Sequence, residues 1–485
     1  MQRKNKSDKF DVMLTREVIL ELCRDNPEAI VEIILSLTER VSKLEEQLNK
    51  DSRNSHKPPS SDGLKKRPPK PKPNREAKKK QAGGQEGHKG NTLTLSDNPT
   101  ETIRYEREQC RGCGLQLSEV AGEVVQRRQV IDIPEPKVII TEHQAVSKAC
   151  PCCGVVNQEP LPSELKGQVQ YGAKLRALVT YLMVYQLLPY QRTQELLSTL
   201  YRLTISTGTL HRMLQDGHEL LGEAESQIQA SITQSDVIHV DETGHRVGTK
   251  TWWLHVASTE QWTFYYSHPA RGQRAHQEGT ILPEFKGTAV HDFYHAYLSY
   301  ECEHALCNAH LLRDLQAVLE REETQSWAKR LSQLLVLSHR LKQRAQAEGE
   351  TVLPEATLMR LEQLYDDIVA RAHALHPKPP PSTKRGRTKQ TKTRNLIDRL
   401  LTYKLDILRF IFDFKVPFDN NLAERDLRMV KVQQKISHCF RSQGGAALFC
   451  RIRGYISTLL KQGYELFPIL VRVFQGDVFI PVPAE

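Results

Sequence analysis

Two aspartates and a glutamate in this sequence have the types and surroundings that a pair of metal ions requires. Asp241 lies in "SDVIHVDETG", an apolar segment typical of a buried strand, and Asp292 ends a similar segment in "GTAVHDFYHAY". Glu424 falls in the first turns of a helix expected to begin near Asp419–Asn421. Because a buried carboxylate is costly unless it is paired or binds a metal, the three acids predict a site for two Mg²⁺ (or Mn²⁺) ions and phosphoryl transfer.

Each acid also has a simpler explanation. An aspartate at a strand end often caps the next turn, and Glu424 with Arg428 has the spacing of an ordinary helical ion pair. Lys431 and Lys435 extend the same helix face, so a basic stripe follows the glutamate and would hold a phosphate backbone near the metals. Strand alternation points Glu242 to the opposite face from Asp241, so it is assigned no metal. The three contexts together favour catalysis.

These residues need a framework that brings them together. Residues 235–300 alternate short apolar runs with turns and are expected to form strands, whereas 305–375 have the periodicity of helices. Helices return after a basic, proline-rich break and continue to about residue 465. Residues 165–225 are also predicted to be helical, with a break at Thr204–Gly208, and both a helix-turn-helix and a plain packing unit fit this pattern. The sequence therefore predicts a multidomain α/β protein.

Two C-x-x-C pairs about 36 residues apart predict a structural zinc site. Two knuckles of this kind complete a tetrahedral set of four thiolates and leave no open position. The proposed ligands are Cys110, Cys113, Cys150 and Cys153. Cys152 is a spare thiol that replaces Cys153 if the register is shifted by one. Short strands are expected between the pairs, at 129–134 and 137–146, so this is a small β-rich, zinc-ribbon-like module.

A second metal-like spacing occurs in "HALCNAHLLRDL". Cys307 and His310 form a C-x-x-H pair, with Cys302 and His304 close by in the sequence. A single pair of this type is a weak signal for metal. The alternative is a packed helix start whose polar groups support the neighbouring site, and both interpretations stay open for Cys307 and His310.

The N-terminal region combines an apolar seam with a basic arm. The seam steps by 4, 3, 4, 3 and 4 residues, which predicts a leucine-zipper-like helix that self-associates or packs on its own domain; its members are Ile30, Ile34, Leu37, Val41, Leu44 and Leu48. Residues 51–90 hold 12 Lys and Arg against 4 Asp and Glu and too few apolar residues for a core. The arm is either a solvated linker or a DNA-binding segment. Its candidate DNA-binding residues are Lys65, Lys66, Arg67, Lys78, Lys79 and Lys80.

Composition narrows the partners and the compartment. The 485 residues carry a net charge of +10, which favours a polyanionic partner, nucleic acid before an anionic membrane surface. The most lipid-like run, residues 177–185, is half the length of a membrane span, and the N-terminus has no apolar signal core. Ten cysteines with two C-x-x-C pairs fit a reducing compartment, so a cytoplasmic protein is expected.

Several of these segments together resemble transposases of the insertion sequence sixty-six family. The resemblance spans nearly the whole chain, in the order "KPPSSD", "GGQEGHKG", the paired cysteines, "YGAKLRALVTYL", "LPYQRTQELL", "HVDETG", "HDFYHAY", "CNAHLLRDL", "NNLAERDLR…QQK" and "SQGGA". The family belongs to the Asp-Asp-Glu class with an RNase H-like catalytic fold. The resemblance implies that Asp241, Asp292 and Glu424 are the catalytic acids. The family's usual "RK" is Gln434-Lys435 here, which favours Lys435 as the phosphate contact.

The resemblance implies a domain order and a set of partners. The expected partners are transposon terminal inverted repeats, target DNA, a second copy of the chain through its N-terminal helix, and accessory proteins of the same element. The expected location is the bacterial cytoplasm, at the nucleoid when DNA is bound. The expected ranges are 1–50 for the zipper-like helix, 51–95 for the basic linker, 96–162 for the zinc module, 163–230 for a helical DNA-binding domain, 231–440 for the RNase H-like domain with a helical insertion at about 305–400, and 441–485 for a helical tail.

The predicted activity is cleavage of a strand at each transposon end and transfer of the freed 3′-OH into target DNA. No G-x-x-x-x-G-K-[ST] loop is found, so no nucleotide cofactor is expected. One alternative is an RNase H-like nuclease that cuts without joining. Another is a zinc-containing DNA-binding regulator whose acids are structural, and a third is a decayed copy.

Overall fold

The computed structural model describes residues 35, 37–38, 41, 93–165, 167–321, 325–378 and 390–482. The described residues fall into two compact units. The larger unit holds those of 1–65, 162–198 and 203–485, and the smaller holds those of 66–161 with Thr199–Arg202. Each unit is considered by itself below.

A five-stranded mixed sheet forms the centre of the larger unit. Strands β3 (Val237–Val247), β4 (Lys250–Ser258) and β5 (Thr263–His268) form an antiparallel meander, and β6 (Thr288–His291) and β7 (Glu303–Leu306) add in parallel, in the order β5-β4-β3-β6-β7. Gly248 has a φ of 57° in the two-residue connection from β3 to β4, a conformation that glycine adopts without strain. The α/β character that the sequence predicts is confirmed.

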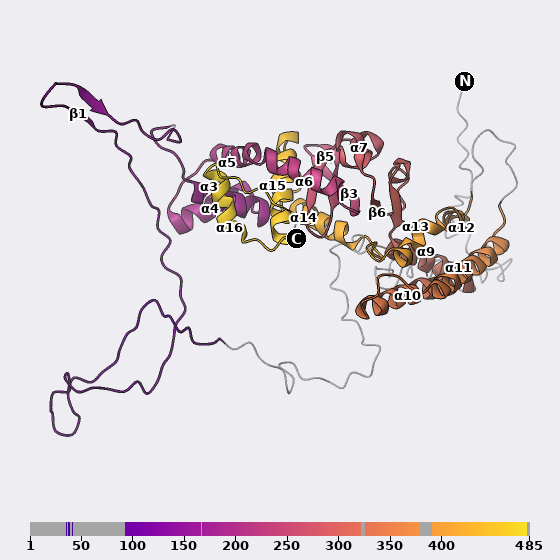
Figure 1. The fold of residues 1–485 in the computed structure, drawn as a ribbon, viewed down its shortest axis with the longest axis horizontal. Helices are drawn as coiled ribbons and strands as arrows, with labels where there is room; N and C mark the ends of the chain where they lie inside the picture. The colour runs from indigo at the N-terminus through magenta and orange to yellow at the C-terminus, as the bar shows by residue number, and fades with distance from the viewer. Residues whose placement is uncertain are drawn as a thin grey trace, which may run out of the picture. The chain divides into compact units, whose positions relative to one another are not determined.

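Helices from both ends of the unit share one core with this sheet. The preceding helical elements are α3 (Ala173–Thr180), the π-helical turn η2 (Tyr181–Tyr185), α4 (Tyr190–Tyr201), α5 (Thr207–Leu220) and α6 (Gly222–Thr233). The C-terminal α15 (Gln443–Lys461) packs on β5, and α16 (Leu466–Phe474) lies beside α3, as the yellow and purple ribbons of Figure 1 show. A Cβ at Gly454 would lie 3.0 Å from the Thr263 carbonyl oxygen, so α15 approaches β5 closely.

The turn between α4 and α5 ends earlier than the sequence suggested. The break was expected over Thr204–Gly208, but α5 begins at Thr207. The Ser206 hydroxyl accepts a hydrogen bond from the Thr209 N–H at 3.1 Å, which satisfies one of the free donors at the helix start. A serine cap therefore decides this boundary, and Gly208 lies inside the helix.

Helices fill the interval between β7 and the helix that carries Glu424. They are α9 (Asn308–Arg321), α10 (Ser326–Ala347), α11 (Glu355–Leu375), α12 (Lys392–Thr402), α13 (Lys404–Phe412) and then α14 (Asn421–Ser437). Three shorter elements, α7 (Gln273–Glu278), α8 (Ile281–Glu284) and η3 (Tyr297–Ser299), flank β6. Leu331, Leu361 and Ile397 belong to one buried cluster with Val290 and Ala305, so these helices and the parallel strands share a core.

The smaller unit contains little regular structure. Its strands β1 (Ser147–Ala149) and β2 (Val156–Gln158) pair antiparallel around the second cysteine pair. The strands expected at 129–134 and 137–146 are wrong, because neither segment has a ladder partner. Ile139 and Ile140 are 86% and 90% exposed, and a strand without a partner leaves its backbone groups and apolar side chains to water.

Several predictions concern residues outside the described ones. Of the zipper seam, the structure describes only Leu37 and Val41, both helical; Ile30, Ile34, Leu44 and Leu48 lie outside. The basic arm with Lys65, Lys66, Arg67, Lys78, Lys79 and Lys80 lies outside as well. Among the residues that are described, no helix has the length and apolarity that a bilayer crossing requires.

Candidate active site

The pairing register of β3 and β6 brings Asp241 and Asp292 to corresponding positions along the two strands. β3 and β6 pair in parallel with His239 opposite Val290, and two further residues along each chain lead to Asp241 and Asp292. The Asp241 Oδ1 accepts the Glu242 N–H at 2.8 Å, and the Asp292 Oδ1 accepts the Tyr294 N–H at 2.8 Å. Both carboxylates therefore lie at the edge where the parallel pairing of β3 and β6 ends.

Helix α14 supplies the third acid from the face of β3. Glu424 lies in its first turn and is half-buried. Further along the helix, the Lys431 Nζ and the Gln434 Nε2 both donate to the Gly244 carbonyl oxygen, at 3.0 and 3.2 Å. These two bonds hold α14 against β3, on the strand that carries Asp241.

The electrostatics of Asp241 reflect this convergence. Burial raises the pKa of Asp241 well above its ordinary value, since the ionised form is poorly solvated. The pKa is raised further by the negative charges of Glu242, Asp292 and Glu424, in that order. Carboxylates close enough to repel one another in this way provide the hard oxygen ligands that divalent cations prefer, and a bound cation would offset the repulsion.

Glu242 has a different environment from its neighbour. Its side chain is 1% exposed, the Arg271 Nε donates to its Oε1 at 2.7 Å, and the Tyr297 hydroxyl donates to its Oε2. The Arg271 guanidinium in turn lies over the ring of Tyr294 at 4.1 Å. Glu242 therefore has a cation and a hydroxyl of its own. Sequence reasoning missed both partners, because no local pattern links residues 29 and 55 positions apart.

Asn420 connects the elements that carry the acids, and sequence reasoning missed this role as well. It is 1% exposed. Its amide donates to the Val240 carbonyl oxygen at 2.9 Å and accepts from the His239 Nδ1 at 2.8 Å, and its backbone N–H donates to the Cys307 Sγ at 3.2 Å. The one signal in the sequence is its place at the expected helix start. Asn420 thereby ties the start of α14 to β3 and to the chain after β7.

The predicted basic stripe on α14 divides into two kinds of residue. Arg428 and Lys435 are exposed and have no hydrogen-bond or ion-pair partner among the described residues. Lys431 donates to the Gly244 carbonyl oxygen, and burial lowers its pKa while the charge of Asp241 opposes that shift. Arg428 and Lys435 are therefore the residues of the stripe that remain free to contact a phosphate.

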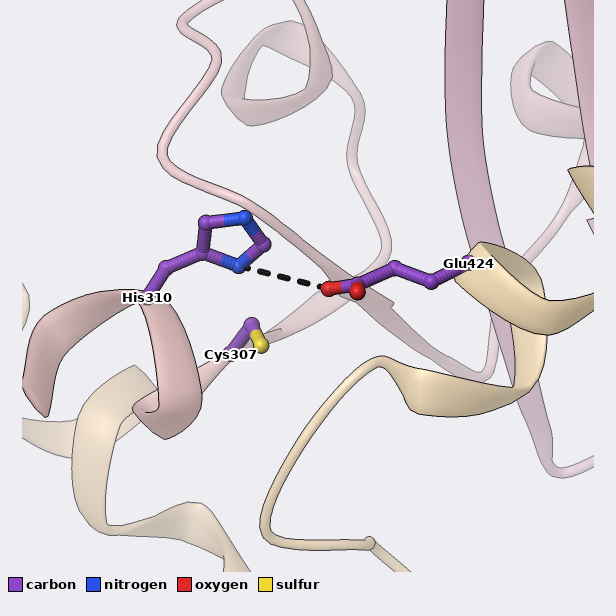
Figure 2. Close-up of side chains that lie close together, drawn as sticks. All are labelled: Cys307, His310 and Glu424. Atoms are coloured by element: carbon purple, nitrogen blue, oxygen red, sulfur yellow. Dashed lines mark ion pairs between the residues drawn. The ribbon is translucent and has the colours of Figure 1, made fainter. Parts of the chain in front are cut away.

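Cys307 and His310 lie next to Glu424. Figure 2 shows the three side chains pointing toward one another, from the start of α9 and the start of α14. The His310 Nδ1 lies 3.8 Å from the Glu424 Oε1, and one ligand atom from each of the three residues lies within 4.8 Å of the others.

The cysteine pairs form two similar knuckles. In the first, the Gly114 N–H donates to the Cys110 carbonyl oxygen at 3.0 Å, and in the second the Gly154 N–H donates to that of Cys150 at 2.9 Å. Both glycines have positive φ, 76° and 72°. Backbone N–H groups of Cys113 and Gly112 lower the pKa of Cys110, as those of Cys153 and Cys152 do for Cys150, which favours the thiolates that zinc binds; the structure does not gather all four thiols at one point.

Models of known protein families match the sequence segments that carry this site. A model of the transposase IS66 family matches residues 168–448, more than half of the chain, and includes the three acids. A model of the zinc-finger binding domain of transposase IS66 matches 107–154 and includes both cysteine knuckles, which supports a structural zinc. A family of unknown function (DUF6444) matches 21–94, and no curated protein matches the chain.

The chain belongs to the IS66 family of transposases, as the resemblance of its motifs indicated. It acts on DNA in transposition, and its family implies a divalent metal.

Proposed function

We propose that this transposase cleaves DNA strands at transposon ends and joins the freed 3′-OH to target DNA, with Asp241, Asp292 and Glu424 as the catalytic acids. The observation that carries the proposal is the strand register that puts Asp241 and Asp292 at one edge of β3 and β6, with α14, which carries Glu424, bonded to β3. The order β5-β4-β3-β6-β7, an antiparallel meander followed by two parallel strands with an acid at their shared edge, supports an RNase H-like catalytic domain.

The chemistry follows from the oxygen ligands. Two Mg²⁺ (or Mn²⁺) ions, when bound, activate the attacking oxygen and stabilise the leaving oxygen of an in-line displacement. Asp241 and Asp292 would hold the ions at the edge of the sheet, and Glu424 would complete the set from α14. Arg428 and Lys435 would hold the phosphate backbone beside them. In the first reaction water attacks a phosphorus and the bond from that phosphorus to the 3′-oxygen breaks, which leaves a 5′-phosphate and a 3′-OH. In the second reaction that 3′-OH attacks a target phosphorus, and the 3′-oxygen of the target strand leaves with the proton.

The segments before the catalytic domain are suited to binding the DNA of the transposon ends. Helices α4 and α5, joined by residues 202–206, have the arrangement of two helices with a short turn that supports a helix-turn-helix role. The zinc module and the basic arm would add DNA contacts, and the N-terminal helix would pair two copies of the chain. These assignments rest on charge, composition and family membership.

The test is cleavage and joining of DNA that carries the element's own ends, with Mg²⁺. Asp292→Asn is expected to lower both rates by roughly 10³-fold or more while end binding persists, because it removes a metal ligand and leaves the DNA contacts in place. Asp367→Asn, an exposed acid on α11, is the matched control and should keep full activity.

Other outcomes identify the alternatives. Cleavage without joined products would indicate a nuclease. Full activity of Asp292→Asn would refute the assignment of the acids, whereas end binding by the wild type without any cleavage would leave a DNA-binding regulator as the remaining function.

A further inference from the structure

A cluster of one thiol, one imidazole and one carboxylate lies beside the three acids. Cys307 follows β7, His310 is in the first turn of α9, and Glu424 is in the first turn of α14. Their ligand atoms lie within 4.8 Å of one another, and among the described residues they are the only such group of three or more (Figure 2).

Two polar atoms of this cluster lack hydrogen-bond partners. The His310 Nδ1 and the Glu424 Oε1 are both buried from solvent and neither has a hydrogen-bond partner. They lie 3.8 Å apart, which is too long for a hydrogen bond between them. Buried polar atoms are nearly always satisfied in folded proteins, so two unpaired atoms that face each other point to a third group between them. A cation would satisfy both at once.

The surrounding backbone holds the cluster in place. The Cys307 N–H donates to the His291 carbonyl oxygen at 2.9 Å, and the next N–H, of Asn308, donates to the Phe418 carbonyl oxygen at 3.1 Å. The Asn420 N–H donates to the Cys307 Sγ at 3.2 Å and partly opposes the burial that raises the pKa of this thiol. Cys307 is fully buried, so its sulfur is shielded from other reactions. The starts of α9 and α14 therefore face each other across a prepared site.

The donor set selects the kind of ion. Sulfur, nitrogen and one oxygen ligand suit Zn²⁺, whereas Mg²⁺ takes oxygen ligands. Zinc ligands at about 2.0–2.3 Å from the ion lie about 3.3–3.7 Å apart in a tetrahedron. The 3.8 Å separation of the His310 Nδ1 and the Glu424 Oε1 is close to that value, and no two ligand atoms of the cluster are more than 4.8 Å apart.

We propose that Cys307, His310 and Glu424 bind one Zn²⁺ ion, with a fourth position open to water. The site rests on its own geometry and not on the proposed cleavage reaction. Its effect on that reaction would be to fix the Glu424 side chain through Oε1. A carboxylate has two oxygens, so Oε2 would still be available to a catalytic ion.

The zinc content of the purified full-length chain tests the site. We expect two zinc ions per chain in the wild type, one in the knuckles and one here, and one in both Cys307→Ser and His310→Gln. His310 is partly exposed, so this second variant preserves the fold. Cys302→Ser, a buried cysteine five residues away and outside the cluster, is the matched control and should keep both ions.

A spectroscopic arm separates this site from the knuckles. In a full-length Cys110→Ser/Cys113→Ser chain, added Co²⁺ should give a charge-transfer band from a single thiolate, and Cys307→Ser should abolish it. One zinc per wild-type chain, or a content that Cys307→Ser and His310→Gln leave unchanged, would overturn the site. Asp292→Asn should keep both zinc ions, because Asp292 is not a ligand of either. The zinc content therefore tests this site independently of the proposed cleavage reaction.

Discussion

Asp241 and Glu242 are adjacent acids whose surroundings give them different roles. Glu242 is the more deeply buried, and Arg271 and Tyr297 compensate its charge. Asp241 accepts one backbone N–H, and the charges of Glu242, Asp292 and Glu424 raise its pKa. A buried carboxylate that is already paired with a cation does not need a metal ion to balance its charge. A carboxylate close to other carboxylates is stabilised by binding a cation. The strand alternation that separated the two residues in the sequence is consistent with this difference.

His276 is a buried imidazole whose stability effect depends on pH. Burial lowers its pKa to about 4, while the unfolded chain titrates near 6.5. Between these values the unfolded state binds a proton that the folded state does not, so stability falls as pH falls. His276→Phe keeps the ring stack on Tyr297 and has no imidazole to protonate. Between pH 7.0 and 5.5 the free energy of unfolding should therefore fall by about 1 kcal/mol less in this variant than in the wild type.

Urea unfolding at the two pH values measures this difference. His373→Phe, at an exposed position on α11, is the control and should retain the wild-type dependence on pH. An unchanged dependence in His276→Phe would show that this imidazole titrates alike in both states.

At the scale of elements, the site depends on how α14 is fixed to β3. The helix carries Glu424 and the strand carries Asp241. Hydrogen bonds join the helix to the strand at two separate places. Near the helix start, Asn420 bonds the Val240 carbonyl oxygen and His239; about three turns later, Lys431 bonds Gly244. Fixing a helix at two points sets both its position and its rotation, which decides where Glu424 points.

Asn420→Ala should disturb this connection without removing a proposed ligand. It leaves the Val240 carbonyl oxygen and the His239 Nδ1 buried without their partner, and we expect the free energy of unfolding to fall by about 2–3 kcal/mol. DNA cleavage by the folded protein should also slow, because Glu424 lies one helical turn after Asn420 and a shift of the helix start would move its carboxylate.

Urea unfolding and single-turnover cleavage measure the two effects. Asn421→Ala is the matched control, since Asn421 is exposed and, among the described residues, its side chain bonds only Asp419. Equal stability and equal cleavage of the two variants would contradict a linking role for Asn420.

At the scale of the whole molecule, the two units are stabilised by different means. The larger unit buries apolar side chains from its sheet and from helices at both ends. The smaller unit leaves most of its apolar side chains exposed, among them Val130, Ile131 and Ile140. A chain segment that buries so little apolar surface needs a metal or another cross-link to hold its fold. Its stability should therefore depend on the zinc of the knuckles.

Cys113→Ser should unfold the smaller unit and spare the larger one. We expect one zinc fewer per chain and rapid tryptic cleavage within 93–161, while the fragment from 162 onward stays resistant because its core is intact. Cys152→Ser is the control that also decides the register, since it should keep the zinc if Cys153 is the ligand. Equal protease resistance of Cys113→Ser and the wild type would show that zinc does not hold the unit together.

Local patterns predicted a large part of the fold and the site. The cysteine spacing and the glycines after it predicted two knuckles, and the apolar runs at 235–300 predicted strands. The strands at 129–134 and 137–146 were wrong, because β-favourable residues form a strand only when a partner is in reach. The boundary before α5 was wrong by a few residues, because a capping hydroxyl acts within one turn and outweighs the general pattern.

The sequence by itself determined the residue types and their local elements, which are set by interactions within a few positions along the chain. It determined the family as well, because the order of the motifs is specific. The tertiary structure decided which groups meet: Arg271 and Glu242 are 29 residues apart, and His239 and Asn420 are 181 apart. It also decided that His310 and Glu424 face each other without hydrogen-bond partners. Burial and charge act through space, so their effects appear only once the sheet and α14 bring these side chains together.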